Sequence, residues 1–307
     1  MTPVSVGFPH DRQQGLSDLT IGTYDGLHRG HQSLIQALVD GAKRHDSTSV
    51  VVTFDPHPRC VLDPPRCPLL ITTVEERAWL LEQMGVDRVL VIPFSRQLAQ
   101  LSAEDFLDKL QLGIRLRRIV VGYDFALGRG RRGDHAFLQE YAERCGFSLE
   151  TISPQLERGT PISSSRIREL VASGKLSEAR DLLGHDFFVR SVVEHGRGTG
   201  RGLGYPTANL RIAAGKLLPP VGVYAVRVEA EEGAWSGAMN LGYRPTFGRG
   251  QLTLEVYLLD FEGDLYGKTL TVWFVERLRE EERFESIARL TEQIAKDVER
   301  TRRILAR

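Results

Sequence analysis

Apolar and polar residues in the first half of the chain alternate between two patterns. Short, largely continuous apolar runs at 18–24, 48–54, 87–94, 116–125 and 147–153 predict strands, and the β-branched run at 48–54 is typical of a strand buried on both faces. Runs with a helical period occupy 31–45, 73–85, 102–112 and 134–146. Strands that alternate with helices predict βαβ units, and hence a mostly parallel sheet covered by helices. In such sheets ligands bind beyond the carboxyl ends of the strands.

The pattern changes after a helical stretch at 163–184. Short strands then follow one another closely at 187–196, 222–232, 234–242, 252–261 and 269–278, with Gly and Pro between them. Near-consecutive strands predict an antiparallel barrel or sandwich. A final helix at 284–305 places one apolar face on Phe284, Ile287, Leu290, Ile294 and Val298. We therefore predict two domains, 1–183 and 184–307, with the boundary near Gly184.

Composition narrows the class of protein. The 307 residues carry 40 basic and 40 acidic side chains, and this neutral balance argues against general nucleic-acid binding, despite basic runs at 115–118 and 128–133. No stretch approaches about 18 consecutive apolar residues, and the first residues lack the apolar region of a signal peptide. Cys60, Cys67 and Cys145 are an odd number at unhelpful spacings, so we expect free thiols in a reducing cytoplasm, without a disulfide framework or a zinc knuckle.

The first candidate site follows the first predicted strand, in TIGTYDGLHRGHQS at 20–33. His28 and His31 are three apart among glycines, so they share a face at a predicted helix start. A helix start attracts anions, and glycine lets a phosphate approach the backbone. A metal site would need a third ligand at a recognised spacing, which is missing here. A plain helix cap with two surface histidines remains an alternative on these residues alone.

A second segment, ISSSRIREL at 162–170, shifts the balance toward phosphate. Ser163 or Ser164 suits a helix N-cap, but Arg166 and Arg168 follow in the first turn, where a cation opposes the helix dipole. A bound anion would relieve that conflict, so the two helix starts together suggest a triphosphate clamp. The nearby GRGRRG at 128–133 matches G-x-G-x-x-G only formally. Its preceding strand ends near Gly122, whereas a dinucleotide fingerprint turns directly from strand to helix.

The second half offers a glycine ladder and one strand carboxylate. Glycines alternate from 196 to 204, which suits an extended segment, a phosphate nest or a flexible surface loop. Thr207 and Asn209 then supply two hard, neutral oxygens, a plausible partial magnesium site. Glu255 interrupts an otherwise apolar strand at 252–261, with Thr253 and Tyr257 on its face. Two interpretations of this carboxylate remain: it faces solvent on the outer side of the barrel, or it takes part in chemistry.

The first half resembles a known family on four motifs. IGTYDGLHRGHQ and ISSSRIREL look like the two signatures of the Rossmann-like nucleotidyltransferases, in which an H-x-G-H pair binds nucleotide phosphates. VTFDPHP at 52–58 and VVGYDFALGRGRRGD at 120–134 narrow the resemblance to bacterial FMN adenylyltransferase. The resemblance implies that ATP is bound by Gly22, His28, His31, Ser164, Ser165 and Arg168. His28, His31 and Arg168 then stabilise the charge of the reacting phosphates. It also implies flavin contacts from Pro56, Pro58 and Phe125.

The second half resembles riboflavin kinase, on GRGLGYPTANL at 200–210, PPVGVYAV at 219–226, NLGYRPTFG at 240–248, LEVYLLDFEGDLYG at 254–267 and LREEERF at 278–284. Nearly the whole chain is thus similar to the bifunctional riboflavin kinase/FAD synthetases. The resemblance implies an α/β Rossmann-like nucleotidyltransferase domain followed by a small antiparallel β-barrel kinase domain with a C-terminal helix. It implies Glu255 as general base, kinase ATP contacts from Gly200, Gly204, Thr207 and Asn209, with Thr207 and Asn209 holding Mg²⁺, and flavin contacts from Arg279 and Phe284.

The expected activity is therefore phosphorylation of riboflavin by ATP to FMN, then adenylylation of FMN by ATP to FAD and pyrophosphate. We expect small-molecule partners only, with no nucleic acid and no membrane, and a cytoplasmic monomer or transient homo-oligomer. Two alternatives stay open. The chain could be a single-activity nucleotidyltransferase with an accessory barrel, or a non-catalytic flavin-binding regulator. An RNA-binding role through the basic loops is disfavoured by the neutral charge.

Overall fold

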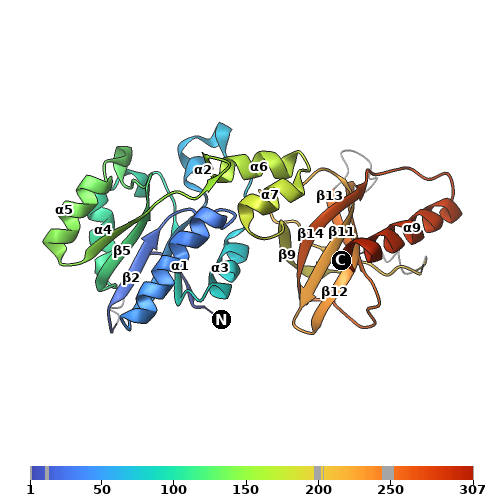
Figure 1. Ribbon diagram of the computed structural model, residues 1–307, viewed down its shortest axis with the longest axis horizontal. Coiled ribbons are helices and arrows are strands. Elements are labelled where there is room, and N and C mark those ends of the chain that lie inside the picture. Colours follow the sequence, from blue (N-terminus) through green and yellow to red (C-terminus); the bar gives the residue numbers. More distant parts are fainter. Residues whose placement is uncertain (1, 11–13, 197–201, 203, 244–251, 307) are drawn as a thin grey trace. The chain divides into compact units, whose positions relative to one another are not determined.

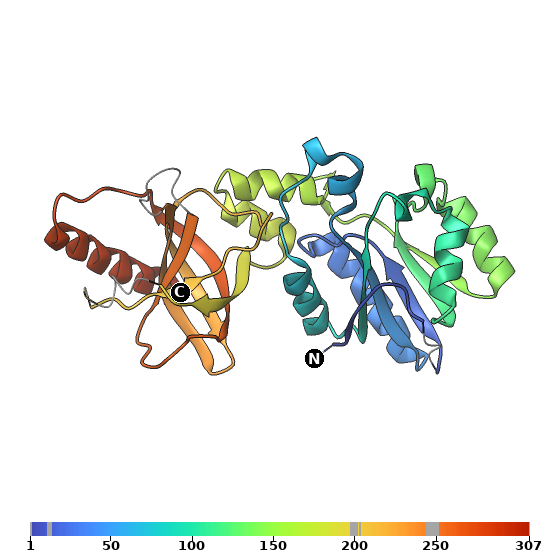
Figure 2. The same ribbon diagram turned by 180° about the vertical axis from the view of Figure 1, so that it is seen from behind.

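The computed structural model describes residues 2–10, 14–196, 202, 204–243 and 252–306. Contacts divide the chain into two compact units, Met1–Ser164 and Ser165–Arg307 (Figures 1 and 2). The boundary that the sequence predicts near Gly184 stays a prediction.

The first unit is built on a parallel sheet. Its six strands run in the order β1-β4-β3-β2-β5-β6, and every neighbouring pair is parallel. The bounds are β1 (Val4–Val6), β2 (Ser17–Ile21), β3 (Thr48–Asp55), β4 (Arg88–Pro93), β5 (Leu116–Gly122) and β6 (Ser148–Ile152). Five of these strands were predicted, and the order reverses between β2 and β5. The reversal makes the carboxyl end of β2 a switch point, where ligands bind in such sheets.

Helices cover both faces of this sheet. They are α1 (Arg29–Arg44), α2 (Pro58–Leu62), α3 (Val74–Gln83), α4 (Ala103–Gln111) and α5 (His135–Cys145). The helices α4 and α5 contribute Phe106, Leu110 and Leu138 to one core cluster, which also holds Leu19 of β2, while α1 lies against the other face (Figure 1). Short 3-10 turns at Pro64–Arg66, Leu98–Gln100 and Arg129–Arg131 and the small hairpin β7 (Leu156–Glu157) and β8 (Thr160–Pro161) complete the unit.

The basic run at 115–118 has a structural task. Asp18 is fully buried at the start of β2 and accepts hydrogen bonds from the Nε atoms of Arg117 (2.7 Å) and Arg118 (2.8 Å). Arg118 also donates to the carbonyl oxygen of Ala37 in α1 (2.9 Å). Buried charges of this kind are tolerated because they are paired and hydrogen-bonded. These two arginines are therefore part of the interior network.

The second unit contains a closed barrel of six antiparallel strands, in the order β10-β13-β12-β11-β14-β9. The strands are β9 (Phe188–Glu194), β10 (Ala208–Leu210), β11 (Gly222–Ala230), β12 (Gly233–Tyr243), β13 (Leu252–Leu258) and β14 (Thr269–Arg279). The structure thus decides for a barrel over a sandwich. Further helices among the described residues are α6 (Ser164–Ala172), which begins at the last residue of the first unit, α7 (Leu176–Leu183) and α9 (Ile287–Leu305).

The prediction of an apolar face on the final helix is wrong for the first residues of that face. Phe284 precedes α9, and Ile287, its first residue, is 71% exposed. The residues that α9 buries are Asp297 and Thr301, while Ile304 packs against Val223 and Leu278 of the barrel. The helix is therefore fixed through its C-terminal half. Among the described residues, no helix combines the length and apolar character that crossing a membrane requires.

Candidate functional site

The histidine pair lies at the true start of α1, two residues earlier than the pattern predicted. His28 is the N-cap residue, and its Nδ1 accepts a hydrogen bond from the backbone N–H of His31 (3.3 Å). The imidazole therefore takes the capping place that Ser, Thr or Asp fills in most helices. The two rings stack, with centroids 3.6 Å apart. Because Nδ1 of His28 accepts, Nε2 is the atom that carries the proton and can donate.

His31 is held neutral by its surroundings. Burial, followed by the proximity of His28 and Arg77, lowers its pKa well below the usual 6.5. The Nδ1 atom of His31 is buried and has no hydrogen-bond partner among the described residues. Another part of the ring lines a cavity. The ring of Tyr24 meets it edge-on at 5.2 Å, and the Tyr24 hydroxyl is 2.5 Å from that of Thr20. A neutral ring with one orphaned nitrogen suits hydrogen bonding to a bound group.

The loop between β2 and α1 is fixed by buried hydrogen bonds. Asp25 is fully buried, and its carboxylate accepts from the backbone N–H groups of Ile71 (3.1 Å) and Thr72 (2.8 Å). Its carbonyl oxygen accepts from the hydroxyl of Ser164 (2.9 Å), which ties the first residue of α6 to this loop. At Gly22 a Cβ would lie 2.7 Å from the ring of Tyr24, so glycine is required for this packing. Ser165 and Arg168 follow within α6 in the second unit.

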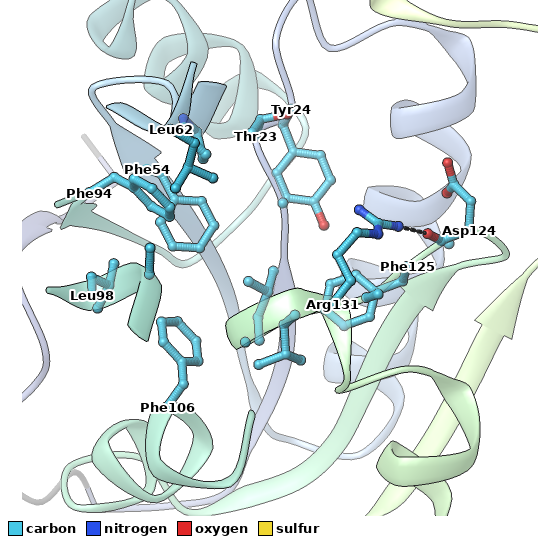
Figure 3. Close-up of a pocket in the computed structure, with 18 of the residues that line it drawn as sticks. Thr23, Tyr24, Phe54, Leu62, Phe94, Leu98, Phe106, Asp124, Phe125 and Arg131 are labelled. Carbon is cyan, nitrogen blue, oxygen red and sulfur yellow. Dashed lines mark hydrogen bonds between the residues drawn. The ribbon is translucent and has the colours of Figure 1, made fainter. Parts of the chain in front are cut away.

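A cavity of about 480 Å³ has His31 in its wall. Figure 3 shows this cavity in close-up. Gly22, Tyr24 and His31 form part of its wall, together with Pro58 and Phe125 of the predicted flavin contacts. The rest of the wall is mainly apolar and aromatic, and includes Leu34, Phe54, Leu62, Phe94, Leu98, Leu101 and Phe106. Pro56 is exposed and does not line the cavity. A flat aromatic ring would bury against such a wall.

The cysteine expectation is wrong for two of the three residues. Cys60 and Cys67 form a disulfide, with their Cα atoms 4.2 Å apart, and Cys145 is a free, exposed thiol. The bond links α2, which contains Cys60, to Cys67 beyond the following turn, and Pro58 and Leu62 of α2 line the cavity. The turn at Pro64–Arg66 brings the two cysteines together, which spacing alone does not reveal. The cysteines therefore do not support the expectation that the chain works in a reducing compartment.

Glu255 lies on the outer face of the barrel among amides. It is half-buried in β13, directly opposite Asn209 of β10 and Asn240 of β12 in the strand register. Residues opposite one another in antiparallel strands share a face, so the carboxylate lies between two carboxamides. Leu254 and Val256 point inward and are buried. The alternation predicted for this strand is therefore confirmed, and the outer position is neither interior nor fully exposed.

Asn209 of β10 lies opposite this carboxylate, and Thr207 immediately precedes β10. Thr207 lines a cavity of about 300 Å³ together with Glu262, Asp264 and Tyr266. Asn209 lines a second one of about 350 Å³ on the neighbouring strands. A Cβ on Gly196 would lie 2.2 Å from the Asn209 carboxamide, so the first glycine of the ladder makes room for that side chain. Gly204 has a left-handed φ of +81°, and Gly200 lies outside the described residues.

The two flavin contacts predicted near the end of β14 lie close together. The guanidinium of Arg279 is 5.6 Å from the ring centre of Phe284. Its Nε and Nη2 donate to Asp297 of α9, at 3.0 and 2.8 Å to Oδ2, and Gln293 also donates to that carboxylate (3.0 Å). Asp297 is buried, so the arginine is fixed by a helix whose apolar pattern gave no sign of this contact.

Sequence reasoning missed two residues in the wall of the first cavity, Asp124 and Arg131. Both lie in motifs that were quoted for other reasons, and Arg131 lies in the GRGRRG run that only imitates a dinucleotide fingerprint. The useful signal was that the run follows the carboxyl end of a strand within a few residues, since this edge of the sheet is where ligands bind. Among the described residues, no three His, Cys, Asp or Glu side chains form a metal-binding group.

Two family models match separate parts of the chain. The FAD synthetase model covers residues 10–166, and the riboflavin kinase model covers residues 183–305. Because both halves match an enzyme family, the accessory-barrel and non-catalytic alternatives are not favoured.

Similar proteins cover nearly the whole chain. The bifunctional riboflavin kinase/FMN adenylyltransferase of Pseudomonas fluorescens is 39% identical over 94% of this chain and 92% of its own length. That of Bacillus subtilis is 34% identical over 97% and 96%. A crystal structure described as a macrolide-efflux protein from Streptococcus pneumoniae aligns with a TM-score of 0.83, at 31% identity, over 97% of this chain and 98% of that one. On this evidence the chain belongs to the bifunctional riboflavin kinase/FMN adenylyltransferase family.

Proposed function

We propose that the chain makes FAD in two steps at two sites. The barrel domain transfers the γ-phosphoryl group of ATP to riboflavin, and the parallel-sheet domain joins FMN to the adenylyl group of a second ATP. The observation that carries the division of labour is the setting of Glu255. A single carboxylate between Asn209 and Asn240 suits deprotonation of an alcohol, whereas the first unit offers a helix start and imidazoles that suit phosphate anions.

The kinase step needs a base because its nucleophile is neutral. The ribityl hydroxyl oxygen forms a bond to the γ-phosphorus of ATP, the bond from that phosphorus to the bridging oxygen breaks, and ADP leaves. Glu255 takes the hydroxyl proton. A positioned general base contributes about 10²–10⁴-fold to such a step. Gly200 and Gly204 belong to the segment proposed to approach the ATP phosphates, and Arg279 with Phe284 is proposed to contact the flavin.

Two residues at the start of β10 are proposed to bind a hard divalent cation. Thr207 and Asn209 offer two neutral oxygens, and the carboxylates of Glu262 and Asp264 share the cavity wall with Thr207. Magnesium prefers oxygen ligands and keeps several places for water and substrate phosphates. When bound, it would neutralise charge that develops on the transferred phosphoryl group. We therefore propose Mg²⁺ at Thr207 and Asn209.

The adenylyl step needs charge stabilisation and no base. The FMN phosphate is already an anion, and its oxygen attacks the α-phosphorus of ATP while pyrophosphate leaves. His28 can donate from Nε2, since its Nδ1 is engaged at the helix cap. The hydroxyl hydrogen of Ser164 is engaged with Asp25, so this serine positions the loop, and Ser165 and Arg168 are proposed to contact phosphate. Donors of this kind contribute about 10²–10³-fold each.

One assay tests the proposal. The purified chain is incubated with riboflavin and ATP, with Mg²⁺ or with a chelator, and the flavins are separated by chromatography. We expect FMN first and FAD later when Mg²⁺ is present, and neither product with the chelator. FMN that never becomes FAD, or riboflavin that stays unchanged while supplied FMN becomes FAD, would overturn the two-step reading.

The cellular location and the oligomeric state of the chain are part of the same proposal. We propose that the chain works in the cytoplasm, where its substrate ATP is made, as a monomer or transient homo-oligomer. Size-exclusion chromatography with light scattering, at several concentrations and with or without substrates, distinguishes these states from a stable oligomer.

A further inference from the structure

The loop at 127–133 is a rigid element in the wall of the first cavity. Leu127 and Gly133 exchange backbone hydrogen bonds of 3.1 and 3.0 Å, which close the loop at its base. The N–H of Arg129 donates to the carbonyl oxygen of Leu101 (2.8 Å). A Cβ on Gly128 would lie 2.5 Å from the backbone nitrogen of Ala103, so the loop packs directly on the start of α4. Its conformation is therefore set by backbone contacts.

This rigid loop presents Arg131 to the cavity. Arg131 has a left-handed φ of +58°, a conformation that costs a non-glycine residue about 1 kcal/mol or more. Its Nη2 donates to the carbonyl oxygen of Asp124 (2.9 Å), and Figure 3 shows its guanidinium on the side of the cavity where Tyr24 and Asp124 lie. The described residues give the rest of the guanidinium no acceptor. An unfavourable backbone conformation held by fixed neighbours is typical of a functional position.

The cavity has a cationic side chain on one side and aromatic rings on the other (Figure 3). Arg131 is the only lysine or arginine among the described residues that line it. Phe54, Phe94 and Phe106 lie together on the opposite side in Figure 3. A ligand with a flat apolar ring at one end and an anionic group at the other matches this arrangement. Arginine is well suited to the anionic end, because its planar fork binds phosphate oxygens in pairs.

We propose that Arg131 binds the phosphate of FMN and thereby separates FMN from riboflavin at the adenylylation site. The inference rests on the proposed function, and it assigns the substrate selectivity of that site to one side chain. Riboflavin carries the same ring and ribityl chain but no phosphate, so it loses this contact. The distinction matters because both flavins are present whenever the two steps run together.

The test compares Arg131→Gln with Arg132→Gln in the full chain. Arg132 is the adjacent arginine, also exposed, that does not line the cavity, so it controls for the loss of one positive charge from the loop. The KM for FMN is measured at saturating ATP, and the KM for ATP at saturating FMN. Lumiflavin, which has the ring without the ribityl phosphate, serves as a competitive inhibitor that reports ring binding alone. An unchanged KM for ATP shows that the adenylylation site is folded, and an unchanged riboflavin kinase rate shows that the barrel is folded.

We expect Arg131→Gln to raise the KM for FMN about tenfold or more, since a hydrogen bond between charged groups is lost. The inhibition constant of lumiflavin, the KM for ATP and the kinase rate stay unchanged, and Arg131→Lys recovers part of the loss. Three outcomes overturn the inference. They are an unchanged KM for FMN, an equal weakening of FMN and lumiflavin, and a change confined to the KM for ATP. Failure of the wild-type chain to make FAD from FMN would instead overturn the proposed function.

Discussion

Replacing Glu255 by glutamine removes the proposed base with little change in shape. The position is half-buried on the outer face of β13, and the buried interior of the barrel is formed by its neighbours Leu254 and Val256. A glutamine amide opposite Asn209 and Asn240 can hydrogen-bond to carboxamides. We therefore expect the free energy of unfolding to change by about 1 kcal/mol or less.

The loss of activity should be much larger and confined to one reaction. Without a base, FMN formation should fall about 10²–10⁴-fold, which corresponds to about 2.7–5.5 kcal/mol of activation free energy. Conversion of supplied FMN to FAD should keep its wild-type rate, because the histidines and the cavity proposed for that step belong to the other unit and Glu255 takes no part in it. The measurement is initial rates of the two reactions, started separately from riboflavin and from FMN and followed by chromatography.

Glu276→Gln is the matched control for this experiment. Glu276 is also a carboxylate on a strand of the barrel, but it is exposed and pairs with Arg300 (2.9 Å). Its replacement should leave both rates unchanged. Equal losses of both activities in Glu255→Gln would indicate a folding defect or a shared site, and a retained kinase rate would show that another group accepts the proton. Either result refutes the reasoning.

Three further predictions concern the first unit and α6. His28→Ala or Arg168→Ala should slow FAD formation about 10²-fold or more while FMN accumulates from riboflavin, as chromatography would show; an unchanged FAD yield would remove the phosphate clamp. Burial lowers the pKa of His31 in the folded chain below its value of about 6.5 in the unfolded chain. The folded state therefore has its full stability above about pH 6.5 and loses stability as the pH falls below that value, because the unfolded chain then binds a proton that the folded chain does not. Between pH 7.5 and 5.5 the wild type should lose up to about 1.4 kcal/mol more unfolding free energy than His31→Gln, measured by denaturant titration, and parallel curves would contradict the neutral ring. Cys60→Ser should lower the unfolding free energy by about 2 kcal/mol under oxidising conditions but not with a reductant, whereas an effect that persists with reductant would point to lost packing at the residue.

The periodicity of the chain predicted most of the fold because packing enforces it. Strands such as 48–54 must be apolar throughout when helices cover both faces, and this requirement is visible in the sequence. Closure of the barrel is not visible, since β10 contains only three residues and its pairing with β9 and β13 depends on distant register. Ile287 misled for a related reason, because α9 is fixed by Asp297 and Thr301, polar residues that a hydrophobic pattern does not count.

The candidate sites were predictable in residue type and less so in local role. Histidine is an uncommon N-cap, so the pattern placed the start of α1 after His28, and the structure shows why it begins earlier. The run at 128–133 was set aside because its glycines match a dinucleotide motif only formally. Its glycines instead let a closed loop pack on α4, and the residue of interest is the arginine between them. Spacing rules identify a motif, while the contacts of its backbone decide what the motif does.

The difference between the two sites follows from the charge of each nucleophile. Asp25 is the buried carboxylate nearest in sequence to the histidines, and its oxygens accept from Ile71 and Thr72, so it supports the loop and does not serve as a base. A free carboxylate beside two reacting phosphates would add repulsion to a step already opposed by it. In the barrel the opposite holds, because the alcohol brings no charge and must lose a proton. In the proposed mechanism Glu255, opposite two neutral amides, accepts the proton of the alcohol, and two separate sites let each step meet its own electrostatic requirement.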